Sequence, residues 1–319
     1  MGTRAAGLTA DDVDRARERD RSIVLTWAMR GTLHLIASED HSWLLPLVLE
    51  PRLATAHRRL RQEGVPPDRW DGAVAAMERM LDAEGPLTRP EIADRLERKG
   101  IRTAGQAIAH LVWLAAARGV LCVGPGSHRE QRFVLVRDWL ARSTTRGGPG
   151  DPLAELGLRY LRSHGPATPT DLAFWSGMRL GDANKAWAAI GSRLIEVDSA
   201  RGSAWRLRTT SRPAPPGQVR LLPAFDEYLL GWRDRDLLAS SAQWRAINRG
   251  GGWLHPVVLA EGRAAGTWRS EQGSGGGVRL TVRPFGTLRP PVRRGVDAEA
   301  KRVAAFLGRR VEALTVERP

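Results

Sequence analysis

Residues 85–96 read GPLTRPEIADRL, and much of this stretch returns at residues 165–176 as GPATPTDLAFWS. In both copies a Gly-Pro pair is followed by a threonine and, three positions later, by an acidic residue. Thr88 and Glu91 have the T-x-x-E spacing of a capping box, in which both side chains satisfy free amides at a helix start. The second copy repeats the spacing with an aspartate. The echo therefore predicts that one small folded unit occurs twice.

The residues around each copy predict the order of elements in that unit. An amphipathic helix precedes each Gly-Pro pair, a short helix begins at the capped threonine, a further helix follows it, and alternating apolar residues then indicate a hairpin. The expected helices and hairpins are 71–85, 89–100, 103–119 and 120–136 in the first copy, and 153–165, 169–178, 180–194 and 194–208 in the second. This order is typical of a winged helix, a module that places a helix or its wing on duplex DNA.

The residues before and after the two repeats have sequence patterns that predict other elements. Residues 30–38, RGTLHLIAS, predict a strand, after which Ser38 is expected to cap a helix. The Pro-rich segment 211–217 predicts a linker, and short alternating runs beyond it predict a small antiparallel, barrel-like sheet that ends with a helix at 297–308. We therefore predict an α+β chain with tandem winged helices. The expected domains are a partial winged-helix or helical domain at 1–70, winged helices at 71–142 and 151–210, and a β-rich domain with a terminal helix at 218–319.

The bulk composition favours a polyanionic partner. The 319 residues carry a net charge of +14, with 49 basic against 35 acidic side chains, and a field of this size attracts nucleic acid. The sequence has no apolar run long enough for a membrane span and no signal-peptide core at its start. Cys122 is the only cysteine, which excludes an intrachain disulfide and a cysteine-rich metal site. We expect a cytoplasmic, nucleoid-associated protein.

Arginines at the two predicted hairpin tips are candidate DNA contacts. Arg129 and Arg132 flank the first tip, and Arg201 and Arg206 flank the second. From such positions a guanidinium can reach phosphates or the minor groove. Winged helices also serve as protein-interaction scaffolds, and this alternative stays open.

Three further stretches carry a family resemblance. MRGTLHLIASED (29–40), LLPAFDEYLLGWRDRD (221–236) and HPVVLAEGRAAGTW (255–268), together with the tandem winged helices, resemble the AlkZ-type DNA glycosylases over nearly the whole chain. The resemblance implies tandem winged helices with a β-rich C-terminal domain. It also implies excision of alkylated bases and, in some members, unhooking of interstrand crosslinks, which would suit self-resistance to a genotoxic natural product.

One motif of that family is not found in this sequence. The family's active site uses a glutamine, an apolar residue and then a glutamine or aspartate, upstream of the RGTLHL strand. None of the six glutamines has this spacing; they are Gln62, Gln106, Gln131, Gln218, Gln243 and Gln272. The motif is expected to fall before residue 1, so either the start codon is misassigned or the chain is a relative that binds DNA without catalysis.

Within the sequence, Asp226 and Glu227 are the best candidates for a catalytic carboxylate. Loss of a base leaves positive charge on the sugar, which a nearby carboxylate stabilises. Adjacent residues on an extended backbone face opposite ways, so at most one of them points into a given cleft. The structural alternative is an ion pair with Arg233 or Arg235 that only holds a turn.

The predicted strand at residues 30–38 offers a second set of polar groups. His34 is a candidate catalytic residue, and Arg30 and Thr32 beside it, like Arg233 and Arg235, are candidate DNA contacts. A partly buried structural histidine is an equal alternative. Trp253 could stack on a base, although burial is the better expectation.

No cofactor or metal is expected, because the seven histidines are scattered singly and no phosphate-binding glycine loop is present. The expected partner is double-stranded DNA, alkylated or crosslinked, and the protein is expected to act as a monomer. Two functions remain: a DNA glycosylase that hydrolyses the N-glycosidic bond of alkylated purines, or a non-catalytic winged-helix DNA-binding or regulatory protein.

Overall fold

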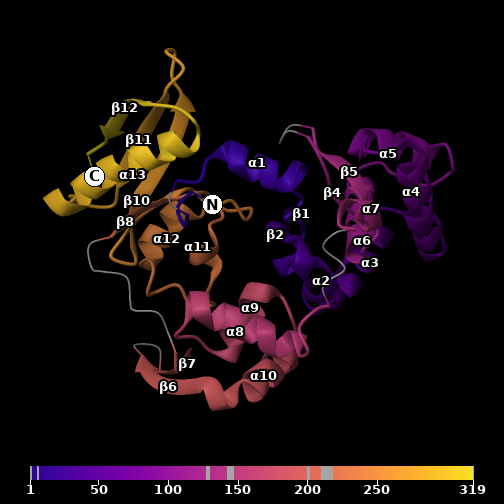
Figure 1. Cartoon of the computed structure of the whole chain (residues 1–319), viewed down its shortest axis with the longest axis horizontal. Helices are drawn as coiled ribbons and strands as arrows, with labels where there is room; N and C mark the ends of the chain where they lie inside the picture. The colour runs from indigo at the N-terminus through magenta and orange to yellow at the C-terminus, as the bar shows by residue number, and fades with distance from the viewer. Residues whose placement is uncertain are drawn as a thin grey trace. The chain divides into compact units, whose positions relative to one another are not determined.

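The chain forms two compact units (Figure 1). The helical unit comprises residues 14–208, and the sheet unit comprises residues 1–13 together with residues 209–319. The computed structural model describes residues 2–5, 7–126, 130–141, 147–199, 202–209 and 218–318. Within these ranges, no helix combines the length and apolarity needed to span a lipid bilayer. The fold is mixed α+β.

The helical unit contains both copies of the repeated stretch. Its strands are β1 (Ile23–Trp27), β2 (Leu33–Ala37), β3 (Leu87–Thr88), β4 (Leu121–Val123), β5 (Arg132–Leu135), β6 (Leu194–Ser199) and β7 (Gly202–Leu207). Its α-helices are α1 (Ala10–Glu18, across the unit boundary), α2 (His41–Leu49), α3 (Leu53–Gln62), α4 (Trp70–Glu84), α5 (Arg89–Glu97), α6 (Ala107–Ala117), α7 (Val136–Trp139), α8 (Pro152–His164), α9 (Pro169–Ser176) and α10 (Leu180–Ala189). Its 3-10 helices are η1 (Met29–Gly31), η2 (Ser38–Asp40), η3 (Glu50–Arg52), η4 (Pro67–Arg69) and η5 (Gly191–Arg193).

Both predicted capping boxes are present. The Thr88 hydroxyl accepts from the Glu91 amide, while the Glu91 carboxylate accepts from the Thr88 amide at 2.7 Å. Thr168 and Asp171 make the same reciprocal pair at the start of α9, with 3.0 Å between the Thr168 amide and the Asp171 carboxylate. The prediction is confirmed at both places, because each pair satisfies free amides of the first helical turn with side chains three residues apart.

The two predicted hairpins are also confirmed in their strands. β4 pairs antiparallel with β5, and β6 pairs antiparallel with β7. The β1–β2 hairpin joins the first of these sheets through the pairing of Leu25 with Val123, which gives a five-stranded order β2-β1-β4-β5-β3. The strands before the first copy therefore extend the sheet of that copy, and β2 is its edge strand.

The predicted helix cap at Ser38 is wrong. Its side chain is buried, and its hydroxyl donates to the Arg21 carbonyl oxygen at 2.6 Å. Ser38 begins the short η2, and α2 starts only at His41. A serine hydroxyl bonds whichever nearby backbone group the fold brings to it, and here it ties the end of β2 to the segment before β1.

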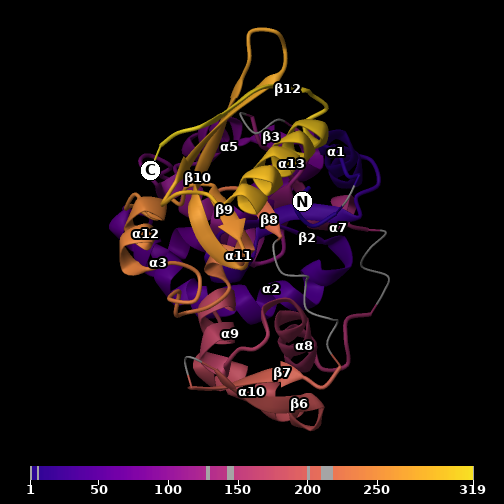
Figure 2. The ribbon, with the colours of Figure 1, turned by 90° about the vertical axis from the view of Figure 1, so that its left-hand side faces the viewer.

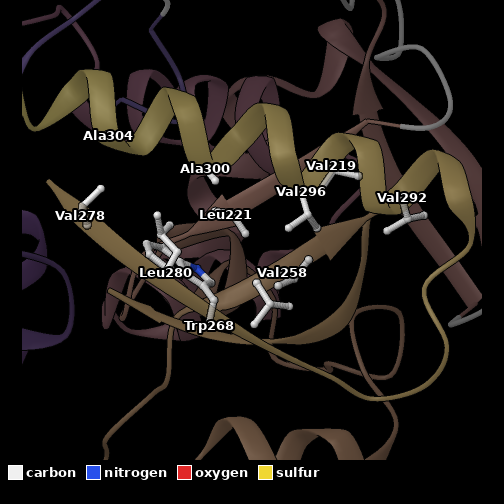
Figure 3. Packing of buried hydrophobic residues seen from close by; sticks show 11 residues of the cluster. Val219, Leu221, Val258, Trp268, Val278, Leu280, Val292, Val296, Ala300 and Ala304 are labelled. Carbon is white, nitrogen blue, oxygen red and sulfur yellow. The ribbon is translucent and has the colours of Figure 1, made fainter. Parts of the chain in front are cut away.

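The sheet unit is a five-stranded sheet with a long helix on one face. Its elements are β8 (Val219–Leu222), α11 (Glu227–Leu230), α12 (Ser241–Ile247), β9 (Val257–Ala260), β10 (Arg263–Gln272), β11 (Val278–Pro284), α13 (Pro290–Phe306) and β12 (Val311–Val316). Helix α13 runs across the sheet (Figure 2). Its apolar stripe, Val292, Val296 and Ala300, packs on Leu221, Leu280 and Trp268 (Figure 3). A second cluster, with Leu229 of α11 and Ile247 of α12, packs against strand residues such as Val257.

The predicted antiparallel barrel is wrong. Among the described residues the sheet has the open order β12-β11-β10-β9-β8, and β12 lies parallel to β11. The reason is α13, which crosses over the sheet between these two strands; a strand reached through such a crossover returns in the same direction. The sequence analysis ended the unit with this helix and assigned no strand to residues 311–316.

Candidate nucleic-acid interface

The turn between β1 and β2 holds the candidate residue Arg30 in a rare backbone conformation. Arg30 has φ 58° and ψ 9°, in the left-handed region that few non-glycine residues adopt. Its guanidinium donates to the carbonyl oxygen of Trp175, near the end of α9. On the other side, the Trp113 indole donates to the Gly31 carbonyl oxygen at 3.2 Å. Contacts from α6 and α9 thus hold this turn in place.

Gly177 makes the close approach to Arg30 possible. It follows α9 with φ 83° and ψ 7°, the left-handed conformation common at helix ends. A Cβ atom on Gly177 would lie 2.9 Å from the Arg30 Cα and 3.0 Å from its backbone nitrogen. Only a glycine fits here without movement of the backbone. The position also places the positive Arg30 at the negative end of the α9 dipole.

His34 and Thr32 lie on the exposed edge of the five-stranded sheet. Thr32 is exposed, and its hydroxyl donates to the Met29 carbonyl oxygen at 3.2 Å. His34 is half-buried, and its Nδ1 lies 2.9 Å from the Thr32 carbonyl oxygen. Because a carbonyl can only accept, Nδ1 carries the proton in the neutral ring, and Nε2 is then the basic nitrogen. Leu33 and Leu35, which alternate with His34, are exposed by 37% and 40%.

Asp226 is part of an ion pair whose partner the sequence analysis did not identify. Its two oxygens accept from the Arg4 guanidinium at 2.6 and 2.7 Å, and one of them also accepts from the Tyr228 amide at the start of α11. The Asp226 side chain is 1% exposed, whereas Arg4 is about half exposed, at 54%. The hydrogen bond to Asp226 raises the pKa of Arg4, and the neighbouring Glu227 carboxylate adds to this effect. The structural alternative in the sequence analysis was a pair of Asp226 or Glu227 with Arg233 or Arg235.

Arg233 and Arg235 lie in the loop after α11. Arg233 is exposed, while Arg235 is half-buried with its guanidinium 4.3 Å from the centre of the Trp244 ring. A cation over an aromatic face is stabilised by the ring quadrupole. Arg235 therefore packs on α12, and Arg233 is the more accessible of the two.

Two of the four hairpin arginines lie outside the described residues, namely Arg129 and Arg201. Arg132 lies at the start of β5, where it donates to the Glu130 carboxylate at 2.7 Å and to the Pro86 carbonyl oxygen at 3.3 Å. Arg206 lies on β7 and donates to the Leu207 carbonyl oxygen at 3.3 Å. Both guanidiniums thus have protein partners at the base of a hairpin.

Trp253 is 67% exposed, contrary to the expectation that it is buried. Its ring centre lies 5.5 Å from that of Phe225, which is itself 42% exposed. Two neighbouring exposed aromatic side chains form a surface on which an unstacked base can lie.

The structure brings the candidates together in two groups, one in each unit. Arg30, Thr32 and His34 lie on one turn and strand of the helical unit, and Asp226 and Glu227 lie beside Arg4 in the sheet unit. The contact of Arg4 with Asp226 joins residues 222 apart in the sequence, and that of Arg30 with Trp175 joins residues 145 apart. Neither contact has a local signal in the sequence. In the described part of the chain, no cluster of three histidine, cysteine or acidic side chains is arranged to bind a metal ion.

Comparisons with known proteins match nearly the whole chain. The model of the DNA glycosylase AlkZ-like family matches residues 1–306. The interstrand DNA cross-link repair glycosylase of Streptomyces sahachiroi is 31% identical over 308 residues, which cover 91% of this chain and 80% of the relative. The solved structure of the Streptomyces sahachiroi DNA glycosylase AlkZ aligns with a TM-score of 0.76 at 29% identity, over 98% of this chain and 86% of that one.

Proposed function

This chain belongs to the AlkZ-like DNA glycosylase family, and we propose that it hydrolyses the N-glycosidic bond of alkylated purines in duplex DNA. We propose further that it unhooks interstrand crosslinks; its Streptomyces sahachiroi relative is named an interstrand DNA cross-link repair glycosylase. The observation that supports both proposals is the 31% identity to that relative across 91% of the chain.

Hydrolysis of an alkylated purine nucleotide needs little general-acid catalysis from the protein. Alkylation at a purine ring nitrogen makes the departing base cationic, so it leaves without first taking up a proton. The sugar then carries developing positive charge, which a carboxylate or an amide dipole stabilises while a water attacks. An alkylated base also pairs and stacks less firmly, which lowers the cost of moving it out of the helix.

We propose Glu227, in the sheet unit, and His34, in the helical unit, as separate candidates for a polar group that acts on the substrate. Glu227 begins α11 and is half-buried, so its carboxylate can stabilise positive charge on a sugar. The His34 ring, with its proton held on Nδ1, can accept a proton at Nε2 from an attacking water. Asp226 is instead a positioning residue, because Arg4 and the Tyr228 amide engage both of its oxygens.

We propose that two winged helices hold the DNA. The segments α4 to β5 and α8 to β7 each have a helix, a capped helix, a further helix and a hairpin in order. Arg132 and Arg206 at the hairpin bases, with Arg30 and Thr32, are the proposed contacts to the sugar-phosphate backbone. Such contacts position a protein on the duplex without reading its sequence.

Replacing Arg132 by alanine is expected to weaken binding to every duplex alike, with a salt dependence shallower by about one unit of slope. The measurement is fluorescence anisotropy of a labelled duplex between 50 and 200 mM salt, which is roughly the range in which such slopes are resolved. Arg137→Ala is the matched control, because Arg137 lies just after β5 and pairs with Glu78 at 2.7 Å. Equal affinities and slopes for the two variants would remove Arg132 from the interface.

Base release tests the proposed activity directly. The wild-type protein is expected to release the base from a duplex with one alkylated purine and to separate the strands of a crosslinked duplex on a denaturing gel. Glu227→Gln is expected to slow release on the order of tenfold, because the amide keeps a dipole toward the sugar cation but loses the negative charge of the carboxylate. Its duplex affinity should not change. Duplex binding without any release would instead support the non-catalytic DNA-binding alternative.

A further inference from the structure

A basic pocket lies in the sheet unit, on the face of the sheet opposite α13. Its volume is about 590 Å³, and its lining includes Arg245, Arg249, Arg269, Arg283, Thr267 and Thr281. None of these side chains belongs to the two groups described above, so the pocket is a separate feature of the molecule.

The floor of the pocket is set by strand register. In the β10–β11 pair, Thr267 lies opposite Arg283 and Arg269 lies opposite Thr281. Since alternate residues of a strand point to opposite faces, these four share one face. Trp268 belongs to the other face, where it is in the core with α13. The core on the α13 side fixes the positions of β10 and β11. It thereby also fixes the positions of the two arginines and two threonines on the opposite face.

The wall of the pocket comes from α12 and the loop after it. Arg245 lies in the last turn of α12, and Arg249 lies just beyond the helix. The loop is held by a bond from the Arg249 amide to the Trp253 carbonyl oxygen at 3.1 Å and by a bridge between Asn248 and Leu254. The backbone at Arg249 is therefore positioned by the fold.

The pocket has an excess of positive charge. Arg283 donates to Glu317 at 2.7 Å, and Arg269 lies 3.5 Å from Glu271. Among the described residues, no carboxylate lies within ion-pair distance of Arg245 or Arg249. The half-buried His255 lines the same pocket; burial, followed by the charges of Arg249 and Arg283, lowers its pKa, so this ring adds no charge at neutral pH.

We propose that this pocket binds a phosphate group, and that its source is a backbone phosphodiester of nucleic acid. Guanidiniums bind phosphate oxygens through paired, charge-assisted hydrogen bonds, and threonine hydroxyls donate to the remaining oxygens. The loop that carries Arg249 also carries the exposed Trp253, so a phosphate and an adjoining base find partners on one segment. The choice of nucleic acid as the source rests on the proposed function, whereas the phosphate site does not.

The test removes the two arginines without an acidic partner, in the variant Arg245→Gln/Arg249→Gln. Affinity for an undamaged, fluorescein-labelled duplex is expected to fall roughly tenfold at 0.1 M salt, and the salt slope to become shallower by about two units. Arg294→Gln/Arg309→Gln is the control, since it removes the same charge from exposed positions on α13 and just beyond it, outside the pocket. The salt slope of this control should stay closer to that of the wild type than the slope of the pocket variant does. Circular dichroism checks that both double variants fold.

A second experiment uses inorganic phosphate. It distinguishes a nucleic-acid phosphodiester from a free phosphorylated ligand as the group that the pocket binds. If the pocket serves a free phosphorylated ligand, phosphate raises the melting temperature of the wild type and the control but not of the pocket variant, and DNA affinity is the same for all three. That result keeps the phosphate site and overturns its nucleic-acid source. If phosphate stabilises none of the proteins and the two double variants bind DNA equally, the site itself is refuted. Base release is measured separately, so its absence bears only on the proposed activity.

Discussion

Gly177→Ala is expected to lower the free energy of unfolding of the helical unit by about 3 kcal/mol, from the left-handed backbone and from overpacking together. The alanine must adopt φ near 83°, and its Cβ meets the backbone of Arg30 at 2.9 Å. That backbone cannot rotate away as a side chain could, so either α9 or the β1–β2 turn must move. Urea denaturation followed by tryptophan fluorescence measures the loss.

Two other glycines separate the causes. Gly119 also has a positive φ, 73°, but a Cβ there meets nothing within 4 Å, so Gly119→Ala measures the backbone strain alone. Gly181 lies inside α10 in open space, and Gly181→Ala should stabilise the helix slightly. Gly177→Ala is therefore expected to destabilise the unit most and Gly119→Ala less, while Gly181→Ala leaves it slightly more stable. Equal losses at Gly177 and Gly119 would mean that contact with the Arg30 turn contributes nothing.

Arg4→Met is expected to destabilise the sheet unit by about 2 kcal/mol, because it leaves the buried Asp226 carboxylate without its counter-charge. Loss of one partner of a fully buried pair costs more, but here Arg4 is 54% exposed and water can reach the vacated space. The measurement is the free energy of unfolding from denaturant titration, with the transition of each unit analysed separately.

A double-mutant cycle with Asp226→Asn isolates the pair. The asparagine keeps an oxygen for the Tyr228 amide, so the coupling energy reports mainly on the ion pair. Arg289→Met is the matched control in the same unit, since Arg289 pairs with Glu261 at 2.7 Å while both side chains are largely exposed. That variant should cost less than about 1 kcal/mol. If Arg4→Met costs no more than the control, the pair with Asp226 does not stabilise the unit.

Local features of the fold could be predicted from the sequence, and the reason is physical. A capping box is closed by residues three apart, so Thr88 with Glu91 and Thr168 with Asp171 could be identified without any tertiary information. The hairpins β4–β5 and β6–β7 likewise depend on near neighbours and on the two-residue period of a strand. The hydroxyl of Ser38 was misjudged because its partner, the Arg21 carbonyl, is reached only after β1 and β2 pair.

The site was less predictable, because its contacts join distant segments. Arg30 and His34 were identified as polar groups near one another, but neither the left-handed turn at Arg30 nor its bond to the Trp175 carbonyl has a pattern in the sequence. The sequence analysis considered an ion pair of Asp226 or Glu227 with the nearby Arg233 or Arg235, whereas Asp226 pairs with Arg4, 222 residues away. The parallel β12 was missed for a similar reason: direction depends on the path of α13 across the sheet.

Because residues 1–13 and residues 209–319 share one unit, synthesis and folding of this protein follow a fixed order in time. Arg4 is synthesised 222 residues before its partner Asp226, and the whole helical unit is made in between. The sheet unit can complete its sheet only after its last strand, β12, has been synthesised. A change at Arg4 consequently affects a segment 222 residues further along the chain, at Asp226.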